Sequence, residues 1–444
     1  MIRRLLPAAW LITVAATGQA QVYFSVPGPD APELARRGDF HVGVRTVEVV
    51  HRNQVDILKF DKVTGKAPLY DRPLKLEVWY PAIIPPGKEE KTTYASAMFG
   101  TQNVGGALES AGKALRDAPP VQGQVFPLVV VSHGYPGSRF FMSYLTENLA
   151  SKGYVVAAID HTDSVFGEVR GFQSTLLNRS NDQLFTIEAL RAMSHDATSF
   201  LNGLADADNV AIVGYSMGGY GALASGGAGY SRNSLLPSAV PGGYMDDWYA
   251  DSAKYKAVRR DHIKAIVAIA PWGEQPPNSA WDENGLAGIH IPSLFIVGDH
   301  DDVAMYETGV KRAFERALNS DRCMLVYEGA RHNTGANPPP PGLTDLRLVQ
   351  GFDEPVWRKD RIIAINQHFI SAFLDWQLKH QQAKREYIHV QPVRSGDGKW
   401  NLARGEQDTG GYSTGKDADG NPFWKGFQRR WALGMEMSCI GAAR

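Results

Sequence analysis

Short apolar runs alternate with amphipathic stretches through the middle of the chain. Helical spacing of apolar residues occurs at 140–152, 182–203 and 360–379. Continuous apolar runs, typical of strands that are covered on both faces, occur at 126–131, 154–159, 209–213, 263–270, 293–297 and 324–327. Apolar strands that alternate with helices predict an α/β fold with a mostly parallel central sheet and helices on both faces.

Two segments before this core have the period-two alternation of strands that are exposed on one face. They cover residues 40–50 and 74–80, and they predict an antiparallel N-terminal lead-in to the sheet. The polar residues 51–71 between them predict a long hairpin loop. Residues 85–124 are rich in Gly, Pro and charge, which predicts a surface excursion with a short helix.

The two ends of the chain differ from this core. Arg3 and Arg4 precede a short apolar run and small residues before a cut after Ala20, so residues 1–20 are typical of an export signal peptide. A retained N-terminal anchor is the alternative, and no later run is apolar enough to span a membrane. We expect an exported protein, periplasmic or extracellular, with one domain at 21–380, a candidate cap at 225–260, and a C-terminal extension at 381–444 that packs on the domain.

Composition narrows the classes of partner. The chain has 444 residues and a formal net charge of −1, without a basic cluster, which argues against nucleic acid as a partner. The two cysteines, Cys323 and Cys439, lack the spacing of metal ligands, and we expect no metal site. Export permits them to form a disulfide, and two buried free thiols is the alternative.

A glycine-rich turn carries the clearest chemical signal. The sequence Gly214-Tyr215-Ser216-Met217-Gly218 lies between an apolar strand and a small-residue segment that begins a helix. This pattern is typical of a nucleophilic serine on a strained turn from strand to helix. Glycines on either side of the serine let the helix approach the strand without a clash. A plain turn that happens to contain a serine is the alternative.

A serine nucleophile needs a base and an orienting acid, and in this topology both follow the serine in the chain. Asp301 follows a late strand and is the favoured acid, with Asp302 and then Asp299 behind it. His332 lies in the loop after the last strand of the core and is the favoured base.

Two other histidines are less suitable bases, because His300 shares the acid turn and His368 lies within a predicted helix. Two backbone N–H groups are needed to bind an oxyanion. Met217 follows the nucleophile, and Tyr135 lies in the loop after the strand at 126–131, so these two are the predicted donors. Tyr135 and Trp272 are also predicted to form a wall of the substrate pocket.

Taken together, these motifs resemble the α/β-hydrolase superfamily, and within it the dienelactone-hydrolase-like and platelet-activating-factor-acetylhydrolase-like esterases, with kinship to cutinase-type polyester hydrolases. The matching motifs cover about residues 40 to 380 and are Val78-Trp79-Tyr80-Pro81-Ala82, Ser132-His133-Gly134, the segment at 149–156, Gly214-Tyr215-Ser216-Met217-Gly218-Gly219 and Gly329-Ala330-Arg331-His332. The resemblance implies a serine triad, an oxyanion pair at Tyr135 and Met217, ester substrates and no cofactor.

The chain departs from these families at two points. True dienelactone hydrolases use a cysteine nucleophile, whereas this chain has Ser216. In the acetylhydrolases the acid follows the strand just after the serine helix, where this chain has Glu274 and no Asp. Asp301 therefore remains the favoured acid, and Glu274 is a fallback.

The sequence thus predicts a serine esterase that acts through an acyl-enzyme. An interfacial lipid or phospholipid acyl hydrolase and a non-catalytic binding protein on the same fold are the alternatives. The acyl length, the alcohol part and the oligomeric state are left open by the sequence.

Overall fold

The computed structural model describes residues 22–96, 108–341, 343–401 and 411–443, so the predicted signal peptide at 1–20 lies outside the described residues. A sheet of ten strands runs in the order β14-β13-β12-β11-β10-β6-β7-β2-β1-β5. Its strands are β1 (His41–Val55), β2 (Leu69–Ala82), β5 (Leu115–Arg116), β6 (Phe126–Ser132), β7 (Val155–Asp160), β10 (Ala205–Tyr215), β11 (Ile263–Ile269), β12 (Ser293–Gly298), β13 (Arg322–Tyr327) and β14 (Met435–Ile440).

The central strands, from β7 across to β13, pair in parallel. β2 runs antiparallel to both of its neighbours, β1 and β7, and β14 runs antiparallel to β13. The short strand β5 pairs in parallel with β1 at the other edge of the sheet. Along β6, Leu128 and Val130 face one core while Val129 and Val131 face the other. Alternate residues of a strand point to opposite faces, so both faces of the sheet are buried. The predicted mostly parallel sheet with an antiparallel N-terminal lead-in is confirmed.

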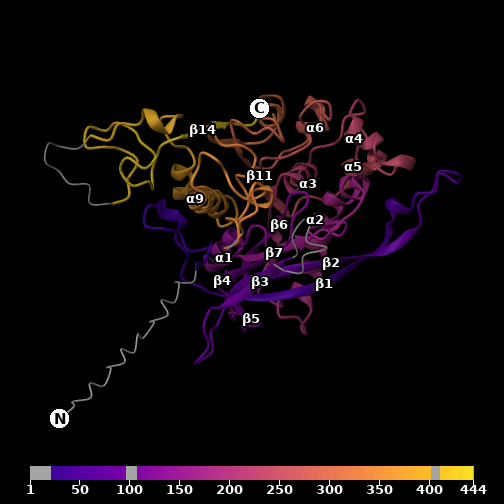
Figure 1. The fold of residues 1–444 in the computed structure, drawn as a ribbon, viewed down its shortest axis with the longest axis horizontal. Helices are drawn as coiled ribbons and strands as arrows, with labels where there is room; N and C mark the ends of the chain where they lie inside the picture. The colour runs from indigo at the N-terminus through magenta and orange to yellow at the C-terminus, as the bar shows by residue number, and fades with distance from the viewer. Residues whose placement is uncertain (1–21, 97–107, 342, 402–410, 444) are drawn as a thin grey trace, which may run out of the picture.

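Two helix layers cover the sheet, on the left and right of β6 and β7 in Figure 1. One face carries α1 (Ser143–Ser151) and α9 (Lys359–Gln377). The other carries α2 (Phe172–His195), α3 (Met217–Ser225) and α7 (Lys311–Arg316). α2 begins ten residues before the predicted helix at 182–203, because its first turns bury polar residues and lack the apolar periodicity that marks a helix in sequence.

The N-terminal hairpin differs from its prediction in length. β1 continues to Val55 and β2 begins at Leu69, so the connection between them is shorter than the predicted loop at 51–71. The hairpin that they form projects as a long arm (Figure 1). Within 85–124, the described residues form β3 (Thr92–Ser96), β4 (Leu108–Gly112) and β5 and no helix; residues 97–107 lie outside the description.

Residues 225–260, the candidate cap, contain α4 (Leu235–Ser238) and α5 (Ala253–Ala257). Several of their side chains, including Tyr230, Leu236 and Trp248, pack into the same core as α3. Two further short helices follow, α6 (Glu283–Leu286) and α8 (Leu346–Val349).

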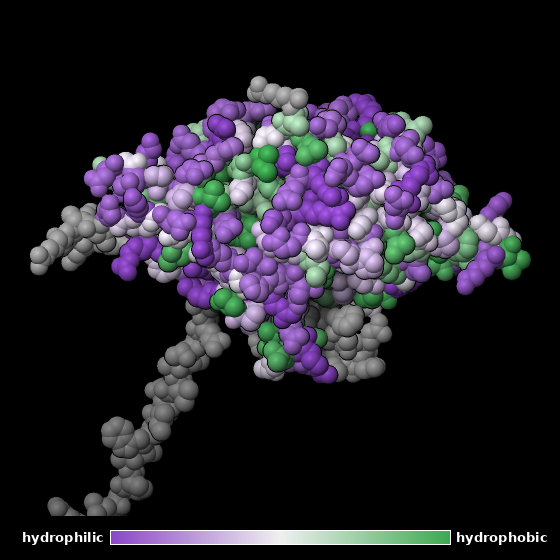
Figure 2. All heavy atoms as spheres, turned by 90° about the horizontal axis from the view of Figure 1, so that it is seen from above, coloured by the Kyte–Doolittle hydropathy of each residue, from purple (hydrophilic) through white to green (hydrophobic). Residues whose placement is uncertain are grey.

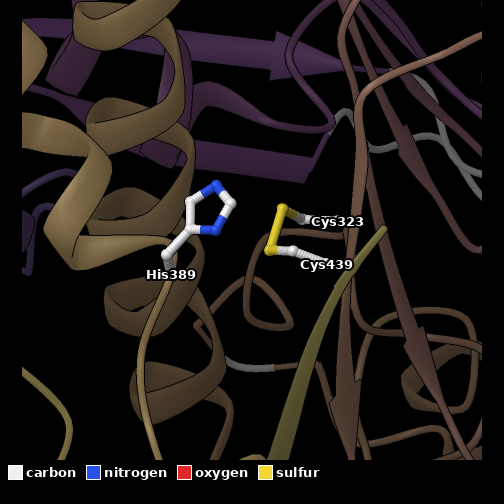
Figure 3. Close-up of side chains that lie close together, drawn as sticks. All are labelled: Cys323, His389 and Cys439. Carbon is white, nitrogen blue, oxygen red and sulfur yellow. A yellow bond between two sulfur atoms is a disulfide. The ribbon is translucent and has the colours of Figure 1, made fainter. Parts of the chain in front are cut away.

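The C-terminal segment packs against α9 and ends as an edge strand. Trp424 is fully buried, and its ring lies 5.8 Å from that of Phe369 in α9. β14 then pairs with β13, and Cys439 forms a disulfide with Cys323 on the opposite strand, which resolves the pairing that the sequence left open. Figure 3 shows the His389 ring beside this bond, but bonded sulfurs do not offer the thiolates that a metal needs.

The molecular surface is largely hydrophilic on the face drawn in Figure 2, where apolar residues are scattered in small groups. In the part of the chain that the structure describes, no helix has the length and apolar character needed to cross a membrane.

Candidate active site

Ser216 occupies a strained turn between β10 and α3. Its backbone has φ 53° and ψ −115°, a conformation that residues other than glycine rarely adopt. A Cβ on Gly214 would lie 2.1 Å from the Gly218 carbonyl oxygen, and one on Gly218 would lie 2.0 Å from the Ser132 carbonyl oxygen. Only glycine fits at both positions, so the sequence pattern is a steric requirement of this turn.

Three side chains that are distant in sequence meet at the carboxyl ends of the parallel strands. Ser216 Oγ lies 3.0 Å from His332 Nε2. His332 Nδ1 donates to Asp301 Oδ2 at 2.9 Å, because a carboxylate oxygen can only accept this hydrogen bond. The other oxygen of Asp301 accepts from the backbone N–H groups of Val303 and Ala304 at 2.9 and 2.8 Å. The carboxylate is thereby fixed with one oxygen toward the imidazole.

The other candidate acids have different partners. Asp302 pairs with Arg331, and Asp299 accepts from the Gly329 N–H at 2.6 Å. Glu274 is buried, accepts from the Trp281 N–H at 3.1 Å and pairs with Arg312 at 2.9 Å. Burial raises the pKa of Glu274 to about 7. Among these carboxylates, Asp301 is the one hydrogen-bonded to His332.

The two other histidines are also accounted for. His300 is largely exposed and its Nδ1 donates to Asp299 at 2.7 Å. His368 is buried in α9, where its Nδ1 accepts from the Leu34 N–H at 3.1 Å. Among the described residues, the partner of the His300 ring is Asp299 and that of the His368 ring is the Leu34 backbone, and neither ring is hydrogen-bonded to Ser216.

The predicted oxyanion donors flank the serine. Met217 is the first residue of α3, and the first N–H groups of a helix have no acceptor within the helix. Tyr135 follows Gly134, where a Cβ would lie only 3.2 Å from the Ser216 Cβ. The backbone of this loop therefore approaches the serine closely. Tyr135 precedes a cis proline, Pro136, which has no N–H to offer.

A buried arginine in α2 holds the loop that carries Tyr135. Arg179 Nη1 donates to the His133 carbonyl at 2.7 Å, and Nη2 donates to Ser164 Oγ at 2.8 Å and contacts the Gly134 carbonyl at 3.5 Å. His133 Nδ1 donates to the same Gly134 carbonyl at 2.7 Å. That carbonyl shares a peptide plane with the Tyr135 N–H, so fixing one fixes the direction of the other.

This anchoring continues into a buried polar network. His133 Nε2 accepts from the His161 N–H at 3.3 Å, and the His161 ring lies between Ser132 Oγ at 2.8 Å and Asp182 at 2.9 Å. Asp182 also pairs with Arg72 at 2.8 Å. Burial lowers the pKa of His161 to about 3 and holds that of His133 well below its usual value. Both rings are therefore neutral, each with one fixed donor nitrogen.

The loop that carries His332 is held from its other side. Glu354 accepts from the N–H groups of Arg331 and Asn333, the two neighbours of His332, at 2.7 and 2.6 Å. Lys359 Nζ donates to the Asn333 carbonyl. Sequence reasoning missed Glu354, Arg179 and His161; the one available signal was that His161 directly follows the end of a strand, at the edge where the other candidates lie.

Aromatic rings line the cavity that opens onto Ser216. This cavity has a volume of about 320 Å³, and its lining includes Tyr135, Phe141, Phe166 and Phe352. The Phe141 ring lies 5.7 Å from Phe166 and 5.4 Å from Phe352, so the three rings form one packed wall. Flat apolar groups fit such a wall well.

Trp272, the second residue predicted to wall the pocket, lies on the other side of the serine turn. Its backbone N–H donates to the Ser216 carbonyl at 3.2 Å. Its ring contacts that of Phe172 at 5.5 Å, and Phe172 in turn contacts Tyr135 at 5.0 Å. Trp272 is thus linked to Tyr135 through Phe172, but it is not among the residues that line the cavity.

Comparison with known proteins adds to this geometry. Residues 101–199 match the family described as platelet-activating factor acetylhydrolase, isoform II. Cutinase est2 of Thermobifida alba is 25% identical over 215 residues, which cover 48% of this chain and 55% of that protein. Cutinase 2 of Thermobifida cellulosilytica is 24% identical over 215 residues, which cover 48% of this chain and 63% of that protein. The chain therefore spans little more than half the length of these curated relatives.

A solved structure extends the likeness over most of the chain. The ferulic acid esterase from Streptomyces cinnamoneus superposes with a TM-score of 0.52 at 22% identity, over 79% of this chain and 94% of that one. The sheet order, the strained serine turn and this superposition define an α/β-hydrolase fold. Within that superfamily, the predicted resemblance to acetylhydrolase-like and cutinase-type proteins is confirmed by the sequence matches.

Proposed function

We propose that the protein is a carboxylic ester hydrolase that acts through a serine acyl-enzyme. The observation that carries this proposal is the hydrogen-bonded chain from Ser216 through His332 to Asp301 at 3.0 and 2.9 Å. A serine hydroxyl is a weak nucleophile unless a base takes its proton, and the base must be held in the right tautomer. The similarity to cutinases and to a ferulic acid esterase supports the same reaction class.

In this mechanism, Ser216 Oγ attacks the ester carbonyl carbon while its proton moves to His332 Nε2. The N–H groups of Met217 and Tyr135 bind the oxyanion that forms. Collapse of the tetrahedral intermediate breaks the bond to the alcohol oxygen, which leaves with the proton from His332. Water then attacks the acyl-enzyme, gives one proton to His332, and releases the acid as Ser216 regains that proton.

The test is a comparison of two serine variants. Ser216→Ala is expected to lose turnover of p-nitrophenyl esters by several orders of magnitude and to lose covalent labelling by a fluorophosphonate probe. Ser231→Ala is the matched control, because Ser231 is also a buried serine in a Gly- and Tyr-containing turn but contacts the Asn233 N–H instead. Turnover and labelling by Ser216→Ala at the level of the control would refute the proposal.

A second candidate is an interfacial acyl hydrolase that acts on lipid or phospholipid esters. The match of residues 101–199 to the acetylhydrolase family favours it. Its signature is a rise in activity when a substrate passes its critical micelle concentration, and a flat response would argue against it. The third alternative, a non-catalytic binding protein, predicts an unlabelled Ser216.

We further propose that the protein is exported. The disulfide between Cys323 and Cys439 supports this, because such bonds persist in oxidising compartments. Fractionation of cells that produce the full chain tests the proposal, and a protein that stays reduced in the cytoplasm would contradict it.

A further inference from the structure

α8 and the turn that follows it separate two cavities. Leu346, Val349, Gln350 and Asp353 line one cavity of about 530 Å³. The intervening residues 347, 348, 351 and 352 line the aromatic cavity of about 320 Å³. The spacing within each set is that of one side of a helical turn, so this segment is a partition with a different face toward each cavity.

The candidate catalytic residues are divided between the two cavities in a way that fits the reaction. Val303, His332 and Asn333 line both cavities, whereas Ser216 and Tyr135 line only the aromatic one. In acyl transfer the acyl group stays on the serine beside the oxyanion donors, and the leaving oxygen accepts its proton from the histidine. The acyl group therefore belongs in the aromatic cavity, and the alcohol belongs on the His332 side, in the larger cavity.

The lining of the larger cavity suits a hydroxylated alcohol. Leu346, Val349 and Pro355 offer apolar surface, while Gln350 and Asp353 offer hydrogen-bonding groups. Donors and acceptors both occur there, since the Gln350 amide offers both, and Arg331 and Asp302, which pair with each other, also line the cavity. Glu354 is already bonded to two backbone N–H groups. Polyols and sugars combine carbon-bound hydrogens with hydroxyls, which match apolar and polar surfaces together.

We propose that this cavity, between α8 and the His332 loop, is the leaving-group site and that it takes a polyhydroxylated alcohol such as glycerol or a sugar. The inference rests on the proposed ester hydrolysis and adds the alcohol part of the substrate to it. The side chain of Gln350 is the main determinant, because it is exposed on the partition and faces this cavity.

The test compares esters of one acid with different alcohols. Methyl benzoate, 1-glyceryl benzoate and benzoylcholine share an acyl group that suits the aromatic cavity. We expect kcat/KM for the glyceryl ester to exceed that for the methyl ester about tenfold or more, as two or three hydrogen bonds would give. A preference for methyl benzoate, or for the cationic choline ester, would overturn the proposal.

Variants of the partition identify the cavity responsible. Gln350→Ala is expected to lower the glyceryl-to-methyl ratio of kcat/KM about three- to tenfold, the effect of one lost hydrogen bond. Gln350→Trp, which fills the cavity, is expected to abolish the preference. Arg347→Ala is the matched control on the opposite face of α8; it is expected to affect both esters alike and to keep the ratio within twofold of wild type.

The outcomes separate this inference from the proposed function. If the wild type hydrolyses none of these esters and Ser216 is not labelled by a fluorophosphonate, the proposed function fails. If the wild type hydrolyses them but both Gln350 variants keep the wild-type ratio, the ester hydrolase stands and the leaving-group site is wrong. A ratio that falls in Arg347→Ala instead would assign the alcohol to the aromatic cavity.

Discussion

Replacing Arg179 tests whether the buried network behind the Tyr135 loop acts on catalysis. Arg179→Met keeps an unbranched apolar stem in the place of the arginine stem and removes the guanidinium donors. The His133 carbonyl and Ser164 Oγ then lose hydrogen bonds of 2.7 and 2.8 Å from a charged group. Arg179 is buried, and no ion pair joins it to a carboxylate among the described residues, so its charge is directed at the His133 carbonyl and the Ser164 hydroxyl.

The expected loss of kcat follows from the Tyr135 N–H, the proposed oxyanion donor that this loop presents. Hydrogen bonds to charged groups contribute about 1.5–3 kcal/mol each, so the loop loses roughly 3–6 kcal/mol of restraint, less what is regained because a buried charge is removed. Complete loss of one oxyanion donor costs about 10²–10³ in kcat. His133 Nδ1 still holds the Gly134 carbonyl at 2.7 Å. We therefore expect a partial effect, a fall in kcat of roughly 10- to 100-fold with KM changed little.

The assay is steady-state hydrolysis of a p-nitrophenyl ester, together with the affinity of a trifluoromethyl ketone that forms an oxyanion on the serine. Both kcat/KM and this affinity should fall in parallel. Arg322→Met is the control, because Arg322 is also buried and donates to the carbonyls of Phe314 and Glu315 at 2.6 and 3.2 Å, at the start of β13 and away from the site. The reasoning is refuted if Arg179→Met folds as well as the control yet keeps kcat within threefold of wild type.

Three further predictions follow from the same structure. Asp301→Asn is expected to lower kcat about 10⁴-fold, because the amide cannot hold the same imidazole tautomer. Asp302→Asn removes only the surface pair with Arg331 and should lower kcat less than fivefold. Equal losses of kcat in the two variants would contradict the assignment of Asp301. Burial raises the pKa of Glu274 from 4.5 to about 7, so the folded state binds one more proton than the unfolded state between these pH values. The contribution of Glu274 to the free energy of unfolding therefore falls as the pH rises from 4.5 to 7. Urea unfolding at pH 5 and pH 8 should show a smaller decline in the free energy of unfolding for Glu274→Gln than for wild type, and this variant should keep its esterase activity. Gly214→Ala places a Cβ 2.1 Å from a backbone oxygen and should lower the free energy of unfolding by about 3 kcal/mol. Gly396→Ala should change the free energy of unfolding little, because its Cβ would meet nothing nearer than 4.0 Å. Similar melting temperatures for the two variants would refute the steric argument.

The sequence predicted the strands and the candidate triad because both leave local signals. Each buried parallel strand is a short apolar run. Ser216 follows β10 directly, and Asp301 and His332 lie in the loops that follow β12 and β13. The carboxyl ends of parallel strands lie at one edge of a sheet, so linear position alone predicted that these residues are close together. The structure brings them into hydrogen-bonding distance.

Features that depend on distant contacts were not predictable in this way. Arg179 lies in a helix that buries polar residues, so its role depends on the loop that it meets and not on its neighbours in sequence. α8 is only four residues long and follows a proline-rich stretch without apolar periodicity. β14 did carry a signal, since Met435, Met437 and Cys439 alternate with polar residues, but its pairing with β13 spans 116 residues.

The bond between Cys323 and Cys439 encloses the His332 loop, the α8 partition and α9 within a single covalent ring of the chain. A protease that cuts an exposed turn inside this ring would leave the two fragments joined, and the sheet would still hold both of their ends. Such a nicked protein should migrate as one species without reductant and as two with it. The segment that carries the candidate base would thus stay covalently attached to both edge strands, β13 and β14, after a single cleavage.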